Sequence, residues 1–335
     1  MSQLPKKVKN GAIVESLKDK LLNQGKVRDI YDIHENFLLM LATDRISIFD
    51  FVLPATVPRK GEILTALTHF WLMHQFGHFL HHLVNSLKFS HRNLVYEVRE
   101  QFPDIPLERS LVVSKTEIPP YEMIFRYHLG GSAWTEYKTT GIVAGQKLPM
   151  GLVRWSRLNN PLFTPSTKSE SEHDANISVQ RFYRQVGKEG LGAVEMFRSI
   201  YKKAYRYAAE RGIVILDTKF EGLKIIADEV LTPDSSRFTT IEDWQKSIEE
   251  NREPIFYDKE LVRQWGKKVK TPFSESGKPI VGINNLDPTN PQHVEFVHSL
   301  KVPQDIIRET ARRYKQIFKM LTGVSLKKYQ TTNLL

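Results

Sequence analysis

Residues 213–231 read IVILDTKFEGLKIIADEVL, two apolar runs separated by charged side chains at alternate positions. Strand side chains alternate between two faces, so Asp217, Lys219 and Glu221 share one face with Ile215. We expect the even-numbered residues of the run to face the core. Because a buried strand seldom carries such charges, the pattern predicts a functional face.

Gly222 and Leu223 form a Gly-X pair of the kind that closes a tight hairpin. In that register Asp217 faces Asp228, and opposed carboxylates repel unless a cation or a proton lies between them. A hard divalent ion with phosphate ligands would resolve the repulsion, with Lys219 beside the same anion. The alternative is a solvated sheet face, and a slip of one residue would break this pairing.

Two further segments offer groups for anions. The turn TPDSSRF at 232–238 places Arg237 in a loop as a candidate anion clamp, with an ordinary surface arginine as the alternative. Arg126 precedes Gly130, Gly131 and Ser132, a turn whose backbone N–H groups could hold a phosphate.

The chain has 335 residues, enough for about two domains, and no cysteine. The absence of thiols fits a reducing compartment. The first residues lack the apolar core of a signal peptide, and no run approaches the ~20 apolar residues of a membrane span. We therefore expect a cytoplasmic protein with no membrane partner.

The net charge is +10, from 48 basic and 38 acidic residues. Nucleic acid or a pocket for several small anions would explain it. The basic residues are scattered, and RNP-type, zinc-finger and basic-zipper patterns are absent, which favours small anions and no nucleic-acid partner. Neither G-x-x-x-x-G-K-[ST] nor G-x-G-x-x-G occurs, so nucleotide binding needs another scaffold.

Strand-like patterns occupy both halves of the chain, with helical patterns segregated between them, which predicts an α+β fold. Strands are expected within 36–54 and 121–129, and helices over 62–87, 178–211 and 303–322. Pro119 and Pro120 predict a boundary between a β-rich domain, 1–118, and a larger α+β domain, 119–335.

A histidine run, HFWLMHQFGHFLHH, places His74, His78 and His82 four residues apart. Such a helical stripe could hold zinc. No carboxylate lies among them and the H-E-x-x-H motif is absent, so we expect helix packing and solvent contact instead.

Taken together, the motifs resemble the SAICAR synthetase (phosphoribosylaminoimidazole-succinocarboxamide synthase) family. They occur in family order over about residues 20–265 and read GKVRDIYDI, LATDRISIFDFVLP, KGEILTALTHFW, RYHLGGSAWTEYKTTGIVAGQKLPMGL, FTPSTKSESEHDANIS, ILDTKFE and ADEVLTPDSSRF. The resemblance implies ATP-dependent ligation of L-aspartate to the carboxylate of carboxyaminoimidazole ribotide, giving the succinocarboxamide ribotide, ADP and phosphate. It also implies ATP and Mg²⁺ as cofactors, with ATP in a cleft between the two domains.

The resemblance assigns roles by position. ATP-binding residues would be Lys26, Arg28, Lys168 and Asp174, and the magnesium carboxylates would be Glu221 and Asp228. Catalytic residues would be Lys219 and Asp217. Substrate-binding residues would be Asp44, Arg45, Ser47, Asp50, Lys60, Arg126, Ser132, Lys219, Arg237 and Arg263. Residues 268–300 depart from the family pattern, and the segment between Glu221 and Asp228 is shorter than usual.

A carboxylate is a poor acylating agent, so ATP would activate it, as an acyl phosphate or through a phosphorylated tautomer of the ribotide. Phosphoryl transfer needs chiefly positioning and charge neutralisation. Asp217 is a candidate acceptor for the proton of the aspartate amine. A nucleic-acid-binding protein and a related ligase or kinase with another acceptor are the alternatives, and monomer and homodimer both stay open.

Overall fold

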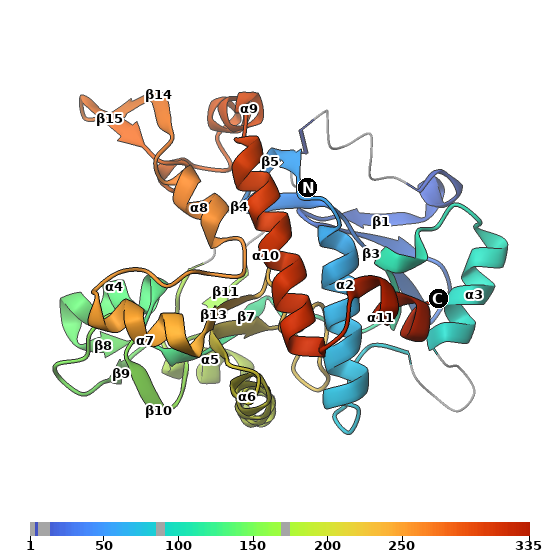
Figure 1. The fold of residues 1–335 in the computed structure, drawn as a ribbon, viewed down its shortest axis with the longest axis horizontal. Helices are drawn as coiled ribbons and strands as arrows, with labels where there is room; N and C mark the ends of the chain where they lie inside the picture. The colour runs from blue at the N-terminus through green and yellow to red at the C-terminus, as the bar shows by residue number, and fades with distance from the viewer. Residues whose placement is uncertain (1–3, 6–13, 85–90, 169–174) are drawn as a thin grey trace.

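The computed structural model describes residues 4–5, 14–84, 91–168 and 175–335 (Figure 1). Two antiparallel sheets, smaller strand pairs and helices around them make an α+β fold, which confirms the predicted class. Among these described residues, no helix is both long and apolar enough to cross a membrane.

The first sheet has the strand order β1-β2-β3-β6, and every neighbouring pair is antiparallel. Its strands are β1 (Leu21–Gln24), β2 (Arg28–Asp32), β3 (Phe37–Ala42) and β6 (Ser110–Ser114). The sequence predicted strands within 36–54, and three form there. Only β3 joins this sheet, because β4 (Arg45–Ile48) and β5 (Phe51–Thr56) pair with each other.

The second sheet has the order β10-β7-β12-β13, again antiparallel, with β11 also paired to β7. Its strands are β7 (Tyr121–His128), β10 (Arg157–Phe163), β11 (Ser166–Thr167), β12 (Ile213–Phe220) and β13 (Ser236–Thr240). The charged strand of the sequence, β12, is therefore a central strand with neighbours on both sides. The other strand pairs are β8 (Ile142–Val143) with β9 (Gln146–Lys147), and β14 (Lys270–Glu275) with β15 (Lys278–Val281).

The helices connect and cover these sheets. Their bounds are η1 (Glu15–Lys20), α2 (Lys60–Phe70), η2 (Trp71–Gln75), α3 (His91–Gln101), η3 (Leu107–Arg109), α4 (Gly131–Thr140), α5 (Val179–Val186), α6 (Lys188–Ala209), α7 (Ile241–Glu249), α8 (Glu260–Gly266), η4 (Ile283–Asn285), α9 (Pro291–Ser299), α10 (Gln304–Thr322) and α11 (Leu326–Asn333). The helices predicted over 178–211 and 303–322 are confirmed as α5 with α6 and as α10. Gly323, in the left-handed conformation, ends α10.

The helix predicted over 62–87 is shorter than expected. It starts at Lys60, continues as the π-turn η2 and ends at Gln75. Residues 80–84 instead run extended, and Val84 donates to the carbonyl of Val112 next to β6. Three-and-four periodicity in a short apolar run does not separate helix from buried strand, which explains the error.

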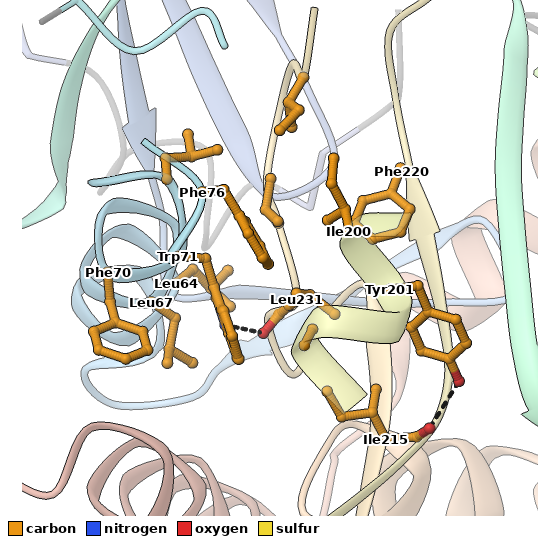
Figure 2. Packing of buried hydrophobic residues seen from close by; sticks show 14 of the residues in the cluster. Leu64, Leu67, Phe70, Trp71, Phe76, Ile200, Tyr201, Ile215, Phe220 and Leu231 are labelled. Atoms are coloured by element: carbon orange, nitrogen blue, oxygen red, sulfur yellow. Dashed lines mark hydrogen bonds between the residues drawn. The ribbon is translucent and has the colours of Figure 1, made fainter. Parts of the chain in front are cut away.

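The largest core cluster joins both sheets to α2, α6, α10 and α11. Figure 2 shows Trp71, at the end of α2, donating to the carbonyl of Leu231, 3.2 Å away. On the far side of this cluster Tyr201 of α6 donates to the carbonyl of Ile215, 2.8 Å away. Both rings bury a large apolar area while their single polar atom is satisfied. Tyr201 therefore connects β12 to α6, and Trp71 connects the loop after β12 to the end of α2.

Strand β12 departs from the predicted hairpin in two ways. It pairs with β7 and β13, so the expected register of Asp217 opposite Asp228 is wrong. After Gly222 the chain turns back for one isolated bridge, between Glu221 and Ala227. A bulge between Ile215 and Asp217 also interrupts the strict alternation. Ile215 packs in the core with α6, so it does not share the charged face with Asp217 as predicted.

The two sheets lie on opposite sides of Pro119 and Pro120 in the sequence. The C-terminal helices α10 and α11 nevertheless pack against α2, which belongs to the first half of the chain. The division into 1–118 and 119–335 therefore stays a prediction.

Candidate active site

One cluster of charges surrounds Asp217. Its Oδ2 lies 3.0 Å from Nη1 of Arg126, its register partner on β7, and 3.1 Å from Nη2 of Arg237 on β13. Although burial opposes it, Asp217 raises the pKa of Arg237, whereas burial lowers the pKa of Arg126. Two guanidinium groups thus face one carboxylate, which leaves positive charge for an anion.

The N-terminus of α4 adjoins this cluster. Gly131 has φ +59°, and a Cβ there would lie 2.5 Å from Nη2 of Arg237. Only a glycine lets the guanidinium approach the start of the helix this closely. Ser132, the second residue of α4, is exposed. The structure therefore brings the predicted residues Arg126, Ser132 and Arg237 to the N-terminus of α4, where the first N–H groups of a helix have no partner within the helix.

Lys219 lies two residues further along β12. Its Nζ is 2.6 Å from Oε1 of Glu122 on β7. Although burial opposes it, Glu122 and Glu221 raise the pKa of Lys219 well above its usual value. The amine is therefore a fixed positive charge and not a proton acceptor.

Glu221 and Asp228 form a second cluster at the end of β12. Burial and the charge of Asp228 both raise the pKa of Glu221, as expected for two neighbouring carboxylates. Each carboxylate holds a cation from another part of the chain. Lys168 Nζ lies 2.7 Å from Glu221 Oε2, and Arg28 Nη2 lies 2.6 Å from Asp228 Oδ2. The predicted metal carboxylates and two of the predicted ATP-binding residues thus meet at one place.

These two carboxylates suit magnesium only in part. Within the described ranges, no three His, Asp or Glu side chains come close enough to hold a metal ion. Mg²⁺ in phosphoryl-transfer sites commonly takes one or two carboxylates and completes its shell with phosphate and water. Buried Glu221 and partly exposed Asp228 fit that demand, and a cation would relieve their repulsion.

Arg45 has a position different from the substrate contact suggested by the resemblance. Its guanidinium is buried, donates to both oxygens of Asp29, and also donates to the carbonyls of Gly25 and Lys26. It therefore fixes the turn that presents Lys26. Lys26 itself is partly exposed and forms an ion pair with Asp50.

The other predicted residues of the first half also bond within the protein. Asp44 accepts from the backbone N–H of Gly61 at 2.9 Å and from Arg109 at 2.8 Å. Ser47 is buried where β4 pairs with β5. Asp44 thus anchors the first turn of α2 to the strand pair.

Lys60 lies fully buried at the first position of α2. Its Nζ is 2.8 Å from Oδ2 of Asp234, whose other oxygen accepts from the hydroxyl of Tyr314 on α10 at 2.6 Å. Although burial opposes it, Lys60 and Lys259 lower the pKa of Asp234. This interior ion pair connects α2, α10 and the loop before Arg237.

Arg263 on α8 is partly exposed, and its Nη1 lies 3.5 Å from Oε2 of Glu260. Lys259, just before this helix, has a pKa that burial lowers to about 8 although Asp234 opposes the shift. Burial and Glu260 raise the pKa of Asp258 to about 7. Asp174, predicted to contact ATP, lies outside the described residues.

Sequence reasoning missed four charged residues of these clusters. They are Glu122, which pairs with Lys219; Glu229, 3.3 Å from Arg28; Asp234; and Lys259. Glu122, Glu229 and Asp234 belonged to segments already singled out, and Glu122 shares a strand face with Arg126. Lys259 carries no sequence signal, because its role depends on burial next to residues far away in the chain.

Comparison with known proteins identifies relatives over almost the whole length. A family model described as SAICAR synthetase matches residues 21–280. The phosphoribosylaminoimidazole-succinocarboxamide synthase of Thermodesulfovibrio yellowstonii is 40% identical over 323 residues, which cover 94% of this chain and 100% of that one. The protein of the same name from Maridesulfovibrio salexigens is 39% identical, with 92% and 95% covered.

Solved structures agree with the sequence relatives. SAICAR-synthase from Saccharomyces cerevisiae, complexed with SAICAR, aligns with a TM-score of 0.71 and 34% identity, covering 91% of this chain and 95% of that one. A type-2 SAICAR synthetase in complex with ADP has a TM-score of 0.57 at 18% identity, and shows the shared fold.

Proposed function

The chain belongs to the SAICAR synthetase family, and on that premise we propose which substrate each of its two charge clusters binds. It is an ATP-dependent ligase of purine biosynthesis that joins L-aspartate to the carboxylate of carboxyaminoimidazole ribotide. The observation that carries the proposal is the pair of neighbouring carboxylates, Glu221 and Asp228, with Arg28 and Lys168 bound to them.

The cluster of Glu221 and Asp228 is the proposed magnesium and triphosphate site. Glu221 and Asp228 would hold the ion, and it would neutralise the phosphate charge that develops during transfer. Arg28 and Lys168 neutralise the two carboxylates in the structure. Once a cation replaces them, both side chains become available to phosphate oxygens. Lys26, partly exposed at the neighbouring turn, is the third basic group for ATP.

The cluster around Asp217 is the proposed binding site for the ribotide phosphate. Arg126, Arg237 and the first N–H groups of α4 supply donors, and Ser132 adds a hydroxyl. Asp217 and Glu221 are four residues apart on an extended strand, about 13 Å. A ribotide lying along β12 could therefore place its phosphate at one cluster and its carboxylate near the other.

Lys219, between the two clusters, is proposed to stabilise the charge of the activated carboxylate. Its raised pKa suits an electrostatic role. Asp217, bound by two arginines, is better suited to orient the phosphate grip than to accept a proton. Lys259, with a pKa of about 8, and Asp258, with a pKa of about 7, can both exchange a proton near neutral pH. We assign the proton of the attacking amine to Lys259, because its charge interacts with Lys219 and Asp234.

The remaining predicted residues divide into contacts and supports. Arg45, Asp44 and Lys60 are proposed as positioning residues, because each is bonded to protein groups that carry the site. Asp50, Ser47 and Arg263 keep their assignment as substrate-side residues without a specified contact. We further place the enzyme in the cytoplasm with small-molecule partners and no nucleic acid, as a monomer or homodimer.

One assay tests the activity directly. The chain is incubated with ATP, Mg²⁺ and the ribotide together with L-aspartate, L-glutamate or no amino acid, and release of ADP is followed. The proposal expects ADP release and a succinocarboxamide product with L-aspartate alone. Equal release with all three would contradict it, and steeply salt-sensitive RNA binding without ADP release would favour a nucleic-acid-binding protein.

A further inference from the structure

Trp155 lies between two of the segments that resemble the family, the first of which ends at Leu152 and the second of which begins at Phe163. Its side chain is 1% exposed, and its backbone has φ +66°, in the left-handed region that a bulky residue seldom adopts. Such a conformation persists only where the surrounding structure imposes it. The contacts of Trp155 therefore identify what this conformation serves.

Hydrogen bonds fix the backbone of Trp155 beside the end of β7. Its N–H donates to the carbonyl of Leu129 at 2.8 Å. Its own carbonyl accepts from Nε1 of Trp244 at 3.0 Å and from Nδ1 of His128 at 3.2 Å. Because His128 and Leu129 directly precede Gly130, these bonds fix the indole relative to the start of α4.

The indole contacts two parts of the proposed phosphate site. A Cβ at Gly130, the N-cap of α4, would lie 1.9 Å from Cζ3 of Trp155, so the ring occupies the space that a side chain there would need. The guanidinium carbon of Arg237 lies 5.6 Å from the centroid of the indole, within the range of a cation–π contact. One ring therefore adjoins both the helix start and an arginine of the site.

The indole is also held at its nitrogen and from one side. Oε2 of Glu253 accepts from Nε1 of Trp155 at 3.2 Å, and Oε1 of Glu253 forms an ion pair with Nη1 of Arg154 at 2.5 Å. Phe256 packs edge-to-face against the indole, with the ring centroids 5.5 Å apart. The ring therefore presents a fixed surface to Arg237.

We infer that Trp155 is a positioning residue for the ribotide phosphate: it holds the guanidinium of Arg237 in place relative to the first N–H groups of α4. The inference rests on the proposed phosphate site. Asp217 fixes one nitrogen of that guanidinium, 3.1 Å away, and the indole limits the orientations left to the rest of the group. Because the anion needs donors from both the arginine and the helix, a small displacement of one weakens binding.

The test compares two substitutions of Trp155 that both fill the buried space with apolar atoms. Trp155→Phe keeps an aromatic face beside Arg237, whereas Trp155→Met supplies a flexible side chain without one. The control is Ile248→Ala, because Ile248 of α7 packs against the same buried cluster as Trp155. It reports what a general loss of packing in this cluster does to the enzyme.

Steady-state kinetics give KM for the ribotide, for ATP and for L-aspartate separately, and circular dichroism verifies folding. We expect Trp155→Met to raise KM for the ribotide about tenfold, while KM for the other two substrates stays within about twofold. Trp155→Phe and Ile248→Ala should keep KM for the ribotide within about threefold of the unmodified enzyme.

A second variant makes the test independent of a substitution at the buried ring. Glu253 is partly exposed, and Glu253→Ala releases the indole nitrogen. It should raise KM for the ribotide selectively, by about threefold or more.

Equal KM values for the ribotide in Trp155→Phe and Trp155→Met would overturn the inference, as would an equal rise in all three KM values. Arg237→Gln, measured in parallel, separates the inference from the proposed function. If Arg237→Gln raises KM for the ribotide and neither Trp155→Met nor Glu253→Ala does, the positioning role is wrong and the phosphate site stands. If Arg237→Gln leaves that KM unchanged, the phosphate site itself is wrong, and the inference fails with it.

Discussion

Replacing Lys60 with methionine tests the interior ion pair that connects α2 to the loop before Arg237. Neither Lys60 nor the carboxylate of Asp234 is exposed by more than 1%, and their charged atoms lie 2.8 Å apart. Removing one partner of such a pair leaves an uncompensated buried charge and typically costs about 3–5 kcal/mol. The bond from Tyr314 and the charge of Lys259 still stabilise Asp234, so we expect the lower end of this range.

The assay is urea unfolding of Lys60→Met and of the double variant Lys60→Met/Asp234→Leu. The single variant should lose about 3 kcal/mol at pH 7, and the double variant should recover part of that loss because no buried charge remains. A single variant within about 1 kcal/mol of the unmodified protein would refute the reasoning.

Acid supplies a second readout of the same pair. The pKa of Asp234 is lowered in the folded protein, so its contribution to stability is present above the unfolded pKa and is lost as pH falls through the folded value. Without Lys60, burial raises the pKa of Asp234 instead. The difference in stability between the two proteins should therefore begin to shrink above the usual aspartate pKa of about 4, where the variant takes up its proton, and shrink further below it. A difference independent of pH would contradict this origin.

Two further changes test the anion grip and the titrating lysine. Gly131→Ala should raise KM for the ribotide about tenfold, because the new Cβ would lie 2.5 Å from Nη2 of Arg237. The matched control is Gly141→Ala, because Gly141 also has a positive φ, +70°, but a Cβ there would have no atom within 4 Å. Equal effects in both would point to backbone strain alone. Lys259→Met should abolish ligation while raising stability by about 1–3 kcal/mol at pH 7. That gain should vanish between pH 8 and the usual lysine pKa, since the cost of burying the charged amine is complete below pH 8 and declines to zero at the unfolded pKa. Unchanged ligation would remove Lys259 from the mechanism.

The sequence predicted the elements whose signals are local. Periodicity located α5, α6 and α10, and alternating residues located β7 and β12. The charged face of β12 was also predicted, because the spacing of Asp217, Lys219 and Glu221 depends on strand geometry alone.

The pairing of β12 was not predictable in the same way. Gly222 suggested a hairpin, yet the partners of β12 are β7 and β13. Strand β7 lies far earlier in the chain, at Tyr121–His128, and β13 follows only after the loop that carries Asp228. A bulge between Ile215 and Asp217 then turned Ile215 toward α6. Such long-range pairings follow from the packing of the whole sheet, and no local pattern records them.

The site shows the same division. Motif resemblance brought Glu221, Asp228, Arg126 and Arg237 into one region. It could not distinguish a residue that contacts the substrate from one that holds the site in place, because Arg45 has the same sequence signal whether it is exposed or buried. That distinction depends on burial, and burial also explains why Lys259 went unnoticed.

The central claim, that Glu221 and Asp228 hold the metal of the nucleotide complex, is tested most directly by the affinity for Mg·ADP. Isothermal titration would compare the unmodified enzyme with Glu221→Gln, Asp228→Asn and the exposed control Glu242→Gln, with circular dichroism to verify folding. The account predicts that the first two variants bind at least about tenfold more weakly, while the control binds normally. Normal binding by both folded variants would contradict it.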